Sequence, residues 1–107
     1  MTTFDKREDA FEHQFAQDEE LKFKATARRN KLLGLWAAEK LGLNDAEAES
    51  YALAVVMAEV EGSGDSDIMQ KLRKDFDAKG VAQSDHQIER TMTELMVRAV
   101  ADIKAGR

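Results

Sequence analysis

The chain has 107 residues without cysteine or proline, of which 43% are apolar and 35% are charged. This length suffices for one domain with a modest core, and without cysteine neither disulfides nor thiolate metal sites can form. The net charge of −5 argues against a general nucleic-acid binder, which needs a surplus of Lys and Arg. The longest apolar run, 52–58, is far shorter than the about 20 residues of a membrane span. Because the first residues lack the basic and apolar stretches of a secretory signal, we expect a cytoplasmic protein.

The first predicted helix is too long for its neighbours. A continuous helix over residues 5–41 would be about 55 Å long, whereas the later helices would be about 20 to 30 Å long. Only residues 21–41 can therefore lie along a bundle, with a core face made of Leu21, Ala25, Leu32, Leu35 and Trp36. Residues 1–20 must overhang, fray or dock elsewhere. We expect an N-terminal segment, 1–20, followed by a bundle, 21–107.

The second predicted helix starts at Asn44, with Glu47 in the capping-box position. Apolar residues surround most of its circumference, namely Tyr51, Leu53, Val55, Val56, Met57 and Val60. A helix that is apolar on most sides is typically enclosed by others. We therefore expect it to be the most buried helix.

Two more helices complete the predicted bundle. The third covers about Ser66 to Lys79, after a cap at Asp65, and Gly80 can end it in a left-handed conformation. The fourth covers about Asp85 to Lys104, with Ser84 and Gln87 forming a capping box. The sequence therefore predicts an all-α four-helix bundle.

Three phenylalanines supply nearly all the apolar surface of residues 1–20. Phe4, Phe11 and Phe15 are spaced seven and four residues apart, which places them on one narrow stripe of a helix. Seven acidic and two basic side chains surround them. An aromatic stripe on a charged helix is typical of a segment that binds in a partner's groove. The alternative is that the stripe folds back onto the bundle or caps its end.

A basic cluster of Arg28, Arg29 and Lys31 follows this segment. Two acid–base pairs nearby have the four-residue spacing that supports an exposed helix: Asp18 with Lys22, and Glu20 with Lys24. This favours a solvated, partly self-paired face. The alternative is a nucleotide site in which the three basic residues hold ATP or ADP, because guanidinium groups suit phosphate oxygens.

No pattern indicates catalysis or metal binding. His13 and His86 lie in different predicted helices, and Asp9 with His13 is only a weak metal pair. The turn at 61–66 lacks the Gly-Lys-Ser/Thr ending of a phosphate-binding loop. We expect no enzyme, no bound metal and no resident cofactor.

Three parts of the chain carry a family resemblance. The first is the N-terminal pattern of Phe4, Asp5, Arg7, Glu8, Phe11, Glu12, Phe15 and Ala16. The second is the block 27–43, and the third is the run IERTMTELM from Ile88 to Met96. In these parts the chain resembles the zeta subunit family of alphaproteobacterial F-type ATP synthases. It departs from the family at the connector, where Gly62, Ser63 and Gly64 replace a Pro-containing acidic turn.

The resemblance implies a four-helix bundle that inhibits ATP hydrolysis by the catalytic head of the synthase. The N-terminal segment would enter an interface between catalytic and non-catalytic subunits beside the central shaft. Phe4, Phe11 and Phe15 would be apolar anchors, Arg7 and Glu8 would pair with charged groups, and Asp5, Lys6 and Glu12 would be rim charges. The protein would bind no nucleic acid, would not insert into a membrane, and would lie peripheral to the inner membrane when bound to the synthase. The alternative functions are a small nucleotide-sensing bundle and a helical adaptor for another partner.

Overall fold

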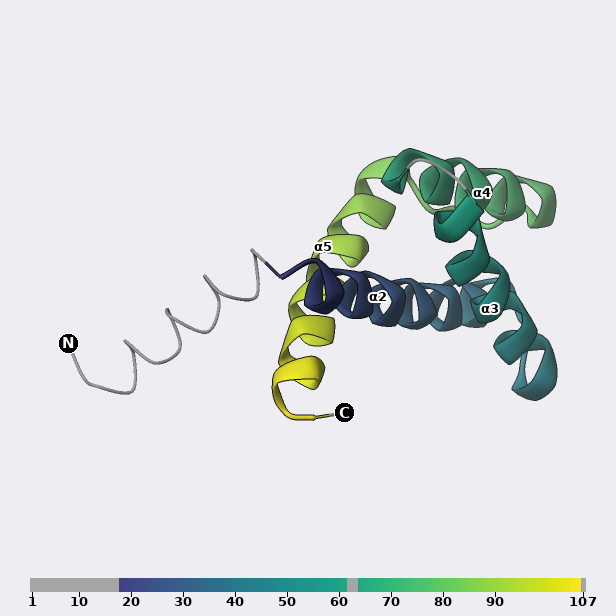
Figure 1. Cartoon of the computed structure of the whole chain (residues 1–107). Helices are drawn as coiled ribbons and strands as arrows, with labels where there is room; N and C mark the ends of the chain where they lie inside the picture. Colours follow the sequence, from purple (N-terminus) through teal and green to yellow (C-terminus); the bar gives the residue numbers. More distant parts are fainter. Residues whose placement is uncertain (1–17, 62–63, 107) are drawn as a thin grey trace.

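The computed structural model describes residues 18–61 and 64–106, and this part of the chain forms four α-helices (Figure 1). Their bounds are Glu19–Lys40 for α2, Asp45–Glu61 for α3, Asp65–Lys79 for α4 and Asp85–Lys104 for α5. The helix α2 packs against both α3 and α5, while α4 packs against α3 and α5. The predicted all-α four-helix bundle is confirmed.

The ends of α2 and α5 follow from their capping residues. The Asp18 carboxylate accepts hydrogen bonds from the backbone N–H groups of Glu20 and Leu21, at 3.0 and 3.2 Å. In α5 the predicted capping box is confirmed: the Gln87 N–H donates to the Ser84 hydroxyl, and the Ser84 N–H donates to the Gln87 side chain. The predicted bounds of α5 are also confirmed.

The start of α4 differs from the prediction. Asp65 is the first residue of the helix rather than its cap, and Gly64 occupies the cap position without a side-chain hydrogen bond. The reason is that the Asp65 carboxylate is engaged by an arginine of α2. At the other end Gly80 has a φ of 69°, so the predicted left-handed ending is confirmed.

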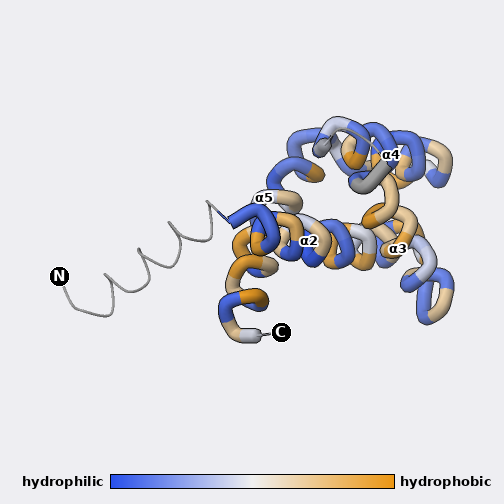
Figure 2. The backbone as a smooth tube through the Cα atoms, in the orientation of Figure 1, coloured by the Kyte–Doolittle hydropathy of each residue, from blue (hydrophilic) through white to orange (hydrophobic). Residues whose placement is uncertain are grey.

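The core is formed where the four helices meet. Its buried members are Leu33, Ala37, Val55, Ile68, Leu72, Phe76, Ile88 and Met92. Trp36 packs edge-on against Phe76, with 5.8 Å between the ring centroids. The tube of α4 in Figure 2 is mostly hydrophilic. The buried residues of α4, Ile68, Leu72 and Phe76, all belong to this core.

The predicted core face of α2 is only partly correct. Ala25 is buried as expected, but Leu21, Leu32, Leu35 and Trp36 are only half-buried. The fully enclosed leucine is Leu33, on the same side as Ala37. The buried face of α2 is rotated around the helix axis from the predicted one, because α3 and α5 both contact α2. The sequence pattern of one helix cannot indicate this arrangement of its neighbours.

The expectation that α3 is the most buried helix is wrong. Only Ala52 and Val55 are buried among its described side chains, whereas Leu53 is 62% exposed and Met57 is 44% exposed. The apolar residues surround the helix, but its neighbours in the bundle cover only part of that circumference.

The contact between α2 and α3 is close because Gly34 lacks a side chain. A Cβ atom at this position would lie 2.5 Å from the Cα of Ala52. Two helix backbones approach this closely only where small residues face each other. Gly34 therefore fixes where α3 crosses α2.

Candidate interaction site

The predicted partner-binding residues lie outside the described part of the chain. They are Phe4, Asp5, Arg7, Glu8, Phe11, Glu12 and Phe15. The structure does define where their segment joins the bundle, because Asp18 caps α2 at its first turn. Any surface close to this turn is also close to the end of residues 1–17.

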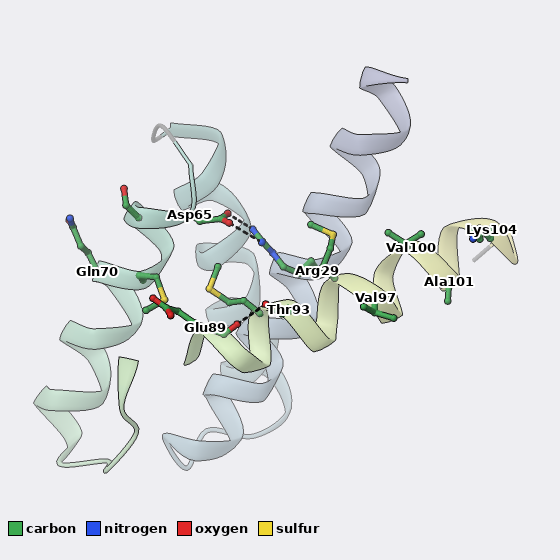
Figure 3. A pocket seen from close by; sticks show the side chains of 13 residues that line it. Arg29, Asp65, Gln70, Glu89, Thr93, Val97, Val100, Ala101 and Lys104 are labelled. Atoms are coloured by element: carbon green, nitrogen blue, oxygen red, sulfur yellow. Dashed lines mark hydrogen bonds and ion pairs between the residues drawn. The ribbon is translucent and has the colours of Figure 1, made fainter. Parts of the chain in front are cut away.

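Arg29 has a different role from the one expected of the basic cluster. It is only 4% exposed, so the expectation of a solvated face is wrong for this residue. Its guanidinium donates to Asp65 of α4 at 2.8 Å and to the side-chain oxygen of Asn30 at 2.8 Å. The pair joins α2 to α4, two helices whose backbones have few close approaches, and Figure 3 shows it beside a groove. The Arg29 side chain therefore links α2 to α4 and is not a free surface cation.

Arg28 is also paired with a distant helix. Its guanidinium donates to Asp102 of α5 at 3.0 and 3.1 Å, and the Asp102 side chain is 9% exposed. Lys31, the third member of the cluster, is exposed. The nucleotide site predicted at these three residues stays a prediction, and two of its three cations already bind carboxylates of this chain.

One of the two predicted pairs near the start of α2 is confirmed. Lys24 lies 3.3 Å from Glu20. Lys22, however, lies 3.9 Å from Glu19 rather than beside Asp18, because the Asp18 carboxylate is used as the helix cap. These exposed pairs contribute little to stability.

One apolar groove lies between α4 and α5 and is called the α4–α5 groove here (Figure 3). Its volume is about 1280 Å³. Methionine and valine side chains make the apolar wall: Met69, Met92, Met96, Val97 and Val100. Arg29 and Asp65 stand at one side. Met92 is buried, whereas Met69 and Met96 are half-buried.

The second groove, of about 750 Å³, lies across α2 and α3. Apolar residues lining it include Phe23 and Ala27 of α2, Leu53 and Val56 of α3, and Ile103 of α5. Met57 is exposed one turn beyond Leu53. We call Phe23, Leu53, Val56 and Met57 the α2–α3 patch. Phe23 was not predicted from the sequence, and Leu53, Val56 and Met57 were expected in the core. A helix that is apolar on all sides can also expose one apolar face, so the pattern around α3 was the signal that could have indicated this patch.

Two polar networks brace α4. The Tyr51 hydroxyl donates to Asp75 at 2.6 Å, and Lys71 lies 3.1 Å from the same carboxylate. Burial raises the pKa of Tyr51, and the Asp75 carboxylate raises it further. Arg73 reaches the start of α5 through Asp85 and also binds Asp77, and these carboxylates raise the pKa of its guanidinium. Both networks are structural links between helices.

Within residues 18–61 and 64–106, no group of three His, Cys, Asp or Glu side chains could hold a metal ion. The helices of this part of the chain are also too polar or too short to cross a membrane. The surface features of the described residues that could bind a partner are the two apolar grooves and the polar side chains beside them.

One comparison with known proteins identifies a family. A family model described as ATPase inhibitor subunit zeta matches residues 1–102. The chain is also similar to a solved structure described as the solution NMR structure of the protein, with 40% sequence identity and a TM-score of 0.71. That match covers 81% of this chain and 99% of the other. Among curated proteins no match was found.

Proposed function

We propose a mechanism for this chain from the premise that it belongs to the ATPase inhibitor subunit zeta family. Its residues 1–20 bind the catalytic head of an F-type ATP synthase and inhibit ATP hydrolysis there. The observation that carries the proposal is the extent of the family match, which begins at residue 1 and so includes the segment with the phenylalanine stripe. In this role the chain regulates an enzyme and is not itself one.

The stripe supplies the binding energy. Phe4, Phe11 and Phe15 enter an apolar groove between a catalytic and a non-catalytic subunit, beside the central shaft, as aromatic anchors of a helix do. Arg7 and Glu8 pair with charged groups of the receiving subunits. Asp5, Lys6 and Glu12 remain at the rim, where individual charges contribute little affinity.

Inhibition requires that one rotary state is preferred. A ligand shifts a conformational equilibrium only through its different affinities for the two states. Because the shape of a subunit interface changes during rotation, a groove that fits the stripe in one state holds the head in that state. The bundle, 21–107, stays outside and limits how far the segment can enter. When bound, the protein lies at the cytoplasmic side of the inner membrane, peripheral to it.

The test is ATP hydrolysis by the isolated catalytic head of a matching synthase, titrated with the full chain and with a Phe4, Phe11 and Phe15 to Ala triple variant. We expect the full chain to inhibit and the triple variant to need at least about 100-fold more protein, since aromatic anchors dominate such interfaces. A Glu12→Gln variant is the control and should change the inhibitory concentration by less than about 5-fold.

Equal inhibition by the wild type and the triple variant would place the inhibitory contact on the bundle. Absence of inhibition by the wild type would leave a helical adaptor for a different partner.

A further inference from the structure

The α2–α3 patch exposes large apolar side chains on a surface that faces water. Phe23 is 66% exposed, Leu53 is 62% exposed and Met57 is 44% exposed. Single exposed apolar residues are common on protein surfaces and need no explanation. Here, however, Phe23 and Leu53 come from two helices and line the same groove, and Met57 extends the surface by one turn. A continuous patch of this kind marks a surface that a partner covers.

The position of the patch indicates which partner covers it. Phe23 is five residues after Asp18, so the two lie about 8 Å apart along the axis of α2. Asp18 directly follows residues 1–17 in the chain. The patch therefore lies close to the point where those residues join the bundle, and a partner that binds them comes near Phe23.

Charges around the patch restrict the chemistry of that partner. Three cationic side chains line the groove with one carboxylate: Lys24, Arg28 and Lys31, with Glu49. The carboxylates that pair with two of the cations, Glu20 and Asp102, do not line it. Lys24 and Arg28 are neutralised by these partners, whereas Lys31 is exposed and forms no ion pair within the described residues. An apolar protein surface with an acidic side chain opposite Lys31 would be complementary to the groove.

We propose that the α2–α3 patch is a second contact between this inhibitor and the catalytic head, docking on an apolar surface that carries an acidic side chain opposite Lys31, beside the opening that receives residues 1–20. This inference rests on the proposed function. The two contacts reinforce each other because they lie on one chain a few residues apart: once the segment is bound, the patch is held at a high effective concentration next to its own site.

The test compares full-length variants in the same hydrolysis assay. A Phe23→Ser, Leu53→Ser double variant should raise the half-inhibitory concentration about 10- to 100-fold. The reason is that the variant lacks two large apolar side chains whose burial stabilises the complex. Inhibition at saturating protein should stay complete, since the phenylalanine stripe is intact. Both positions are exposed, so the thermal unfolding temperature should be unchanged.

The matched control is Val97→Ser. Val97 is 69% exposed, as apolar as Leu53, and lines the α4–α5 groove instead. We expect this variant to inhibit at the wild-type concentration. A second pair of variants tests the charge: Lys31→Glu should slow association several-fold, whereas Lys74→Glu, an exposed position on α4, should not.

Three results would overturn the inference. The first is a double variant that inhibits at the wild-type concentration while the phenylalanine variant does not inhibit, which would leave the proposed function standing. The second is a loss of affinity in Val97→Ser as large as that of the double variant. The third is a wild-type dimer in sedimentation that the double variant dissociates, because a second copy would then cover the patch. A wild-type chain without inhibition would remove the inference together with the proposed function.

Discussion

The helix α2 is joined to α3 and to α4 in two different ways. Towards α3 the backbones nearly touch, because Gly34 faces Ala52 and leaves no space for a Cβ atom. Towards α4 the link is made by long side chains: Arg29 reaches Asp65, and Trp36 reaches Phe76. The close contact leaves no room for a ligand between Gly34 and Ala52, although Ala52 also lines the groove across α2 and α3. Helices spanned by long side chains leave space beside the span. The α4–α5 groove, with Arg29 and Asp65 in its wall, lies beside the second link.

The largest expected effect comes from breaking the long-range link at its exposed end. Asp65→Asn should lower the free energy of unfolding by about 3 kcal/mol, because Arg29 is only 4% exposed and would lose its counter-charge. Urea denaturation measures the change. Glu94→Gln is the control, since its pair with Arg90 is exposed on both sides and should contribute less than about 1 kcal/mol. Equal effects of the two substitutions would contradict the buried role of Arg29.

A smaller effect is expected from widening the close contact. Gly34→Ala should destabilise the bundle by about 1 to 3 kcal/mol, because the added methyl group would meet the Ala52 backbone and force the helices apart. Alanine favours a helix over glycine by about 1 kcal/mol, so Gly34→Ala would stabilise the protein if the close contact imposed no penalty. A lower unfolding temperature in thermal denaturation would show that the clash with Ala52 outweighs this gain. Lys31→Ala, at an exposed position of the same helix, should stay within about 0.5 kcal/mol of the wild type.

The smallest expected effect concerns the polar link between α3 and α4. Tyr51→Phe removes the hydrogen bond to Asp75 and should cost about 1 kcal/mol at neutral pH, because both side chains are only partly buried. The pKa of Tyr51 is raised in the folded protein, so its contribution to stability is complete below the ordinary tyrosine pKa near 10. Above that pH the unfolded chain loses the proton first, and stability falls. Chemical denaturation between pH 8 and 11 should show a smaller alkaline loss in Tyr51→Phe than in the wild type.

The helix bounds were the most predictable part of the fold. Capping residues act within a few positions of the sequence, so Ser84 with Gln87 and the left-handed Gly80 indicated the correct helix ends. Asp65 was misassigned because its competing partner, Arg29, is 36 residues away. A local pattern does not contain that competition.

The buried faces and the candidate site were harder to predict. An apolar helix such as α3 offers several faces for burial, and the choice depends on where Gly34 allows α3 to cross α2. Leu53 and Met57 were therefore assigned to the core although they are exposed. Arg29 was expected to be solvated because the acid–base pairs just before it have the spacing of an exposed helix. The predicted roles of Phe4, Phe11 and Phe15 stay predictions, since these residues lie outside the described part of the chain.

The Arg28–Asp102 pair has a consequence for how the chain folds during synthesis. It joins residues 74 positions apart, and Ala99, one turn before Asp102, is fully buried. Neighbouring helices can meet as soon as they are made, but α2 lacks its α5 partner until the last helix has left the ribosome. Contacts between distant residues form late because closing a long loop costs entropy first. Until then the side of α2 that α5 covers in the finished bundle stays exposed.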